Sequence, residues 1–235
     1  MIRLGKPPRL VSFLGRAGVG KSTLASALVD ELSTPAVGLN SVWLQGGAPM
    51  SIMAFSNMSY VWSMHRAIRR ELSPQRMKGW RDGLKHIQLL VANERFIRCS
   101  MKTPDVCILD ECGSYHALLR LSLRSTNPEN VAWNSILRNE WFTKSQPDVL
   151  VICDLNEDER IKRRATRGMH HDQLLMQDPS RKDFFDRNWK CAWPAIKRAA
   201  HVAHDSGKLT LTTVDMSLPI ESNVDHLSRV VLGLR

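Results

Sequence analysis

The strongest chemical signal in the chain is a run of eight residues that matches the pattern G-x-x-x-x-G-K-S. The run consists of Gly15, Arg16, Ala17, Gly18, Val19, Gly20, Lys21 and Ser22. Glycines let the backbone curl so that successive amide N–H groups point inward at phosphate oxygens. A lysine in this position reaches the β- and γ-phosphates, and the hydroxyl after it ligates Mg²⁺. The pattern therefore predicts a nucleoside triphosphate site, to which we also assign Thr23.

A second candidate group is the acidic pair Asp110 and Glu111, which follows an apolar segment of strand length. An aspartate at the end of such a strand is typical of a carboxylate that holds Mg²⁺ directly or through water. We therefore predict Asp110 and Ser22 as the metal ligands. Four roles are open to Glu111: supporting the Mg²⁺ site, accepting a proton from an attacking hydroxyl, orienting a hydrolytic water, or lying solvated at the strand end.

A third group is a set of arginines in the second half of the chain. They are Arg160, Arg163, Arg164 and Arg167. Their spacing of i, i+3, i+4 and i+7 places them on one face of a helix. A solvated helix face is the alternative, but guanidinium groups this close repel one another unless they meet anions. We expect at least two of them to clamp a transferring phosphoryl group, and we assign catalytic roles to Arg163, Arg164 and Arg167 beside Lys21 and Glu111.

These residues need a scaffold, and the sequence alternates apolar strand-like segments with segments of helical periodicity. The expected strands cover residues 10–14, 36–44, 105–110, 148–154 and 209–215. Most are continuously apolar, which favours a parallel five-stranded sheet with helices on both faces. A ligand is then expected at the carboxyl ends of the strands. The main expected helices cover residues 23–32, 157–167, about 182–200 and 220–234, and Asn156 with Glu159 forms a capping box.

The composition bounds the class of protein. The chain has 235 residues and a formal net charge of +10, and we expect a single α/β domain over residues 1–235. The charge favours anionic partners; nucleotide phosphates account for part of it, and nucleic acid would account for it as well. No uninterrupted apolar stretch reaches the roughly 18 residues of a membrane helix, so no membrane partner is expected. No pattern indicates an oligomeric state.

The cysteines indicate the redox environment. There are five, which is an odd number, and Cys107 and Cys153 lie inside apolar strand-like segments. Buried free thiols in a reducing cytoplasm explain this better than disulfides do. We therefore expect a cytoplasmic protein.

Taken in order, these segments resemble the P-loop kinases of the nucleoside and nucleotide kinase group, most of all thymidylate kinase and deoxynucleoside kinase relatives. The resemblance runs through the loop at residues 15–22, residues 46–49, the strand end at Asp110, residues 148–167 and residues 213–221. It implies a P-loop NTPase fold that uses ATP and Mg²⁺. It also implies an acceptor-side helical segment at about 50–100 and a helical lid at about 168–182 over the donor phosphates.

The acceptor side departs from the thymidylate kinase pattern. Such kinases usually carry Arg-Glu-Pro where this chain has Trp43-Leu44-Gln45, and Asp-Arg where it has Asp110-Glu111. The leading hypothesis is thus an ATP-dependent kinase whose acceptor is a nucleoside or a nucleoside monophosphate. The rival is a P-loop ATPase coupled to a nucleic acid or protein partner, which the Asp-Glu pair and the positive charge favour. A third hypothesis is a regulator that binds nucleotide without turnover.

Overall fold

The computed structural model describes residues 8–32, 35–40, 105–110, 113–124, 127–129, 146–166 and 179–233. Within these ranges strands and helices alternate along the chain. In order they are β1 (Arg9–Leu14), α1 (Lys21–Glu31), β2 (Ala36–Asn40), β3 (Val106–Asp110), α6 (Ser114–Arg124), β4 (Val149–Asp154), α9 (Glu157–Thr166), α11 (Pro179–Asp205), β5 (Thr210–Asp215) and α12 (Ile220–Leu232).

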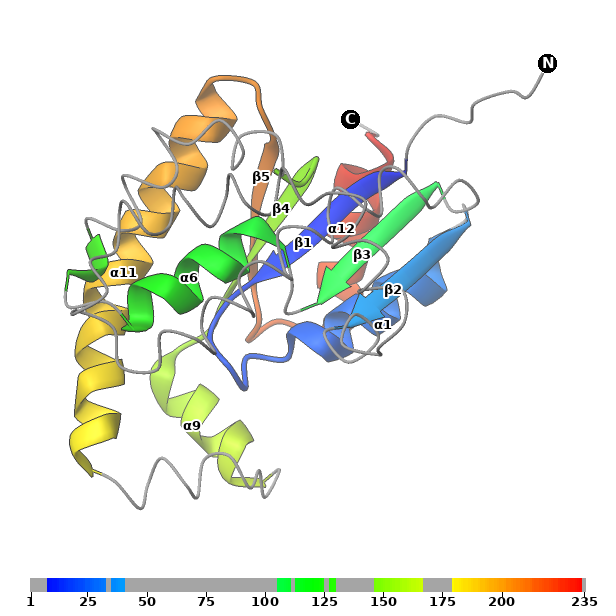
Figure 1. Ribbon diagram of the computed structural model, residues 1–235. Coiled ribbons are helices and arrows are strands. Elements are labelled where there is room, and N and C mark those ends of the chain that lie inside the picture. The colour runs from blue at the N-terminus through cyan, green and yellow to red at the C-terminus, as the bar shows by residue number, and fades with distance from the viewer. Residues whose placement is uncertain are drawn as a thin grey trace, which may run out of the picture.

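The strands form one parallel sheet in the order β2-β3-β1-β4-β5 (Figure 1). The three inner strands are almost completely buried, as their continuous apolar sequences predict. β1 lies in the middle of the sheet, between β3 and β4. The loop that follows β1 therefore emerges at the centre of the carboxyl edge, where a parallel sheet places its ligand.

Helices cover both faces of the sheet, which confirms the predicted α/β fold. α1 packs against α12 and α6 packs against α11, and Figure 1 shows the two pairs on opposite faces. α11 extends further than the sequence predicts and reaches Asp205, although Pro194 within it has no N–H to donate. No helix in the described ranges combines the length and the apolar character that crossing a membrane requires.

The predicted state of two cysteines is confirmed. Cys107 in β3 and Cys153 in β4 are both free thiols and both buried. Burial raises the pKa of the Cys107 thiol to about 11, because the charged thiolate loses its water. These side chains therefore act as small apolar groups in the core.

Removing a core side chain from α1 tests this packing. Leu28 is completely buried in the cluster between α1, the sheet and α12. We expect Leu28→Ala to lower the free energy of unfolding by about 3 kcal/mol, because it removes apolar contacts and leaves a cavity. Leu218→Ala makes the same deletion at a side chain that is 52% exposed and is the matched control. Urea unfolding curves would contradict the packing if the two variants lost equal stability.

Candidate functional site

The loop between β1 and α1 has the backbone geometry that its glycines predict. Gly18 and Gly20 have φ angles of 89° and 103°, in the left-handed region that favours glycine. Gly15 is needed for a different reason, because a Cβ there would lie 2.7 Å from the carbonyl oxygen of Cys153 in β4. The loop thus packs tightly on the neighbouring strand and then turns sharply into α1.

Lys21 and the start of α1 give this loop a concentrated positive charge. The Lys21 side chain is 4% exposed, and its Nζ donates to the carbonyl oxygens of Gly15 and Arg16 at 3.1 and 3.2 Å. Gly20 provides no side-chain cap for α1, and the first turn of this helix contains no acidic residue. The positive end of the helix dipole is therefore not neutralised locally, which favours an anion at this point.

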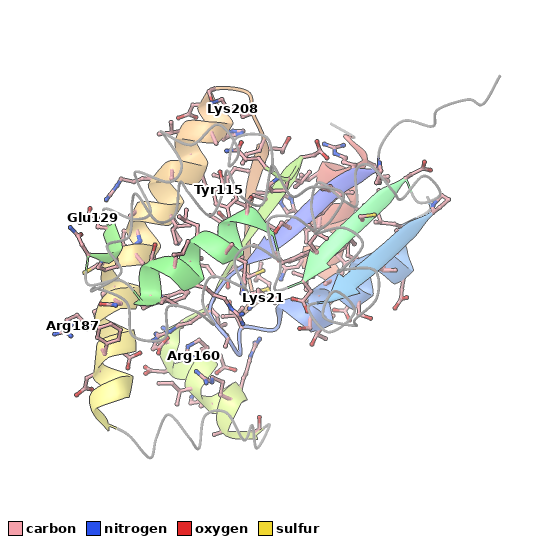
Figure 2. All side chains as sticks on the ribbon, in the orientation of Figure 1. Lys21, Tyr115, Glu129, Arg160, Arg187 and Lys208 are labelled. Carbon is pink, nitrogen blue, oxygen red and sulfur yellow. The ribbon has the colours of Figure 1, made fainter. Side chains whose placement is uncertain are left out.

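Two arginines of α9 bind the outer side of the same loop. Arg160 donates from Nη1 to the carbonyl oxygen of Ala17 at 3.0 Å. Arg163 donates to the carbonyl oxygen of Val19 at 3.5 Å and to that of Met216, just after β5, at 3.0 Å. Figure 2 shows Arg160 on α9 and Lys21 at the start of α1, both near the same end of the sheet. The arginine face of α9 therefore contacts the loop between β1 and α1, and two of its members hold backbone carbonyls there.

Local sequence explains why α9 starts where it does. The Asn156 side chain accepts a hydrogen bond from the N–H of Asp158 at 2.9 Å, as an N-cap residue does. Three acidic residues in the first turn and two arginines in the last turn complement the helix dipole. Of the expected capping box, Glu159 makes a different contact: its carboxylate lies 3.4 Å from Arg163 Nε.

Glu157 supplies the negative charge that allows Arg160 to be buried. Arg160 is 4% exposed and donates to both carboxylate oxygens of Glu157, at 2.8 and 2.5 Å. Arg16 of the loop also pairs with Glu157, at 2.8 Å, and with Asp186 of α11. These contacts, the hydrogen bonds from Arg160 first, hold the pKa of Glu157 below its ordinary value of 4.5.

Arg164 lies directly over the loop. Its Cγ occupies the space that a Cβ on Gly18 would need. Burial lowers the pKa of Arg164, and the nearby charges of Arg160 and Arg16 lower it further. The carboxylates of Glu157 and Asp186 act in the opposite direction, so the Arg164 guanidinium lies beside the loop among charges of both signs.

The two predicted metal ligands lie on adjoining elements. Asp110 is the last residue of β3, and Ser22 is an exposed residue in the first turn of α1. The charges of Lys21 and Asp110 act in opposite directions on Cys153, whose pKa burial raises to about 12. A carboxylate and a hydroxyl offer the hard oxygen atoms that Mg²⁺ prefers, and the residues fit that ion. Among the described residues no cluster of three or more His, Cys, Asp or Glu side chains could hold a metal, but Mg²⁺ commonly uses one or two carboxylates plus phosphate and water.

The structure thus brings the loop, Lys21, Arg163 and Arg164 together at one edge of the sheet. Glu111, Arg167, the expected acceptor-side segment 50–100 and residues 168–178 of the expected lid lie outside the described residues. Sequence reasoning missed three residues that hold Arg16: Glu157, Asp186 and Trp189. The sequence could have indicated that Asp186 and Trp189 act together, because they lie three residues apart on a helix and share a face.

Comparison with solved structures identifies the fold. No protein-family model matches the chain, and no curated protein matches it either. The structure of thymidylate kinase from Candida albicans is similar at 13% identity and a TM-score of 0.53, over 97% of this chain and 92% of that one. The structure of deoxyadenosine kinase from M. mycoides with bound dCTP gives 11% identity and a TM-score of 0.46, over 95% of this chain and 99% of that one. The likeness to thymidylate kinase shows that the chain has the fold of a P-loop kinase.

Gly18→Ala tests the close approach of Arg164 to the loop. The new Cβ requires a left-handed backbone and displaces the Arg164 side chain. Gly207→Ala is the matched control, because Gly207 has a φ of 69° and no atom within 4 Å of its Cβ position. We expect Gly18→Ala to lower the melting temperature by about 3 °C more than Gly207→Ala does. Equal shifts in a calorimetric scan would show that Arg164 does not press on Gly18.

The Glu157 contacts predict an acid-sensitive component of stability. Because the folded pKa of Glu157 lies below its unfolded value, its contribution is present above about pH 4.5 and is lost as the pH falls through the folded value. We expect Glu157→Gln to unfold at lower urea concentration at neutral pH and to lose less stability than the wild type on acidification. Urea midpoints between about pH 6 and 3 measure this. Parallel pH profiles of the two proteins would contradict it.

Proposed function

We propose that this chain is an ATP-dependent phosphotransferase whose acceptor is a nucleoside or a nucleoside monophosphate. The observation that carries the proposal is the way the phosphate loop is held. Cationic side chains bind its carbonyl oxygens at Gly15, Arg16, Ala17 and Val19. A loop whose carbonyls are held by cationic side chains is preorganised to present its amides to an anion, and preorganised donors contribute strongly to phosphoryl transfer.

The donor half of the reaction is assigned to the loop, Lys21 and α9. Amides of residues 18–22 and the Lys21 ammonium would hold the β- and γ-phosphates. Arg164 would neutralise the charge that spreads over the transferring group, while Arg163 keeps the loop attached to the segment after β5. Arg167, which follows α9 in the sequence, is proposed to act together with Arg164 on the transferring group.

Ser22 and Asp110 are the residues proposed to hold Mg²⁺. When bound, the ion would bridge phosphate oxygens and neutralise part of their charge. The nearness of Asp110 and Lys21 to Cys153 supports this assignment, because it puts a carboxylate and an ammonium at the same edge of the sheet.

The acceptor half rests on chemistry and on fold. The similar structure from Candida albicans is that of thymidylate kinase, so this fold serves a nucleotide kinase in that protein. In transfer to a hydroxyl, the attacking oxygen loses its proton, and Glu111 is the residue proposed to accept it. A nucleoside would offer a sugar hydroxyl and a nucleoside monophosphate a phosphate oxygen.

A panel of acceptors with labelled ATP tests the proposal. We expect the label to move to at least one nucleoside or nucleoside monophosphate. Lys21→Met should reduce the transfer rate by about 10²-fold or more, because it removes a preorganised cation from the γ-phosphate site. Lys208→Met is the matched control, because Lys208 is an exposed lysine between α11 and β5. The wild-type rate is expected for that variant.

Three outcomes would overturn the proposal. The first is that no acceptor gains phosphate while the bound ATP stays intact. The second is that ATP is hydrolysed without transfer to any acceptor, which would indicate an ATPase. The third is that transfer continues unchanged in Lys21→Met while melting curves show that this variant is folded.

A further inference from the structure

One face of α11 carries an unusual series of charged and aromatic residues. Asp186, Trp189, Trp193 and Lys197 follow one another at intervals of three or four residues, so their side chains lie on the same side of the helix. We call these four residues the α11 series. None of them belongs to the loop or to the arginine face of α9, yet the series contacts both the loop and β4.

The series begins at the phosphate loop. The Arg16 guanidinium pairs with Asp186, and its Cζ lies 5.1 Å from the ring centroid of Trp189. Trp189 stacks on Trp193 with ring centroids 4.9 Å apart and an angle of 21° between the planes. A cation over an aromatic face and an offset ring pair each contribute favourable energy beyond simple burial. Arg16 is thereby bound to the side of α11 that carries this series.

The series ends at the strand beside the loop. Lys197 lies 5.2 Å from the ring centroid of Trp193, and its Nζ pairs with Asp154 of β4 at 2.7 Å. Asp154 follows Cys153, the residue whose carbonyl lies against Gly15. The contacts therefore close a ring in which two consecutive loop residues and two consecutive strand residues are joined through one face of α11.

We propose that Trp189 and Trp193 are positioning residues for triphosphate binding, acting through Arg16 on the phosphate loop. This inference rests on the proposed function. Both rings already stack on each other and on a cation, which assigns them to holding the loop rather than to stacking on a nucleic acid base. Fixing the loop before the ligand arrives removes an ordering cost from binding, so the stack raises affinity without contacting the ligand.

The test measures MgATP affinity and loop exchange in the full chain. We expect Trp189→Leu to raise the dissociation constant for MgATP, measured by calorimetry, about fivefold, because it removes a cation–aromatic contact. Trp189→Phe retains an aromatic face and should stay within about twofold of the wild type. In the ligand-free proteins, hydrogen exchange of the amides of residues 15–20 should rise in Trp189→Leu, while exchange in β3 stays unchanged.

A matched control lies on the same helix. Arg187 lies 5.9 Å from the ring centroid of Phe184, a cation–aromatic pair that does not include a loop residue. Arg187→Gln should leave both the affinity and the exchange of residues 15–20 at their wild-type values. Lys197→Met, a milder change at a side chain that is 31% exposed, should increase loop exchange in the same direction as Trp189→Leu, so the proposal remains testable if the larger change prevents folding.

The outcomes separate this inference from the proposed function. If the wild type binds no triphosphate, the proposed function fails, and the exchange of residues 15–20 still decides whether the α11 series holds the loop. If the wild type binds MgATP and Trp189→Leu matches it in both affinity and loop exchange, the positioning role is overturned. A rise in exchange that is equal in the loop and in β3 would indicate general destabilisation and would also overturn it.

Discussion

The conformation of the loop between β1 and α1 depends on one constraint: the C=O groups of its tightly turned backbone must find hydrogen-bond donors. Unpaired backbone groups away from water are costly, so each carbonyl needs a donor. Here the donors are charged side chains, namely Lys21 for Gly15 and Arg16, Arg160 for Ala17, and Arg163 for Val19. These hydrogen bonds measure between 3.0 and 3.5 Å, and together they attach the loop to α1 and α9.

Using cations for this purpose creates a second requirement, because buried charges must be balanced. Glu157 balances Arg160 and part of Arg16, and Asp186 balances the rest of Arg16. Burial lowers the pKa of Arg164, Arg160 and Arg16 lower it further, and the carboxylates of Glu157 and Asp186 act in the opposite direction. Any ligand that binds only the folded state also stabilises it. The same arrangement therefore couples ligand affinity to stability.

Much of this could be predicted from sequence because the signals are local. The loop pattern, the apolar strands and the helical periodicity each depend on neighbouring residues, and the parallel sheet with helices on both faces followed from them. The roles of individual arginines did not follow. Spacing placed Arg160, Arg163 and Arg164 on one face, but only the fold shows that the first two bind backbone carbonyls while Arg164 covers Gly18. Trp189 and Trp193 also have helical spacing, but Arg16, the cation that lies over the Trp189 ring, is far away in the sequence.

The distance in sequence between the loop and the residues that hold it shows that the eight-residue motif does not determine the loop conformation alone. The start of the loop is held by α11 through Arg16, its middle by α9 through Arg160 and Arg163, and its end by the segment after β5, where Met216 Cε lies 3.2 Å from the Cβ position of Gly20. All of these contacts come from residues beyond β4, and closing such long chain segments carries an entropic cost that the assembled sheet must offset. The motif can be recognised from local sequence, but its shape is stabilised by the second half of the chain. We therefore expect changes in α9 or α11 to alter the conformation of the loop while its own sequence stays the same.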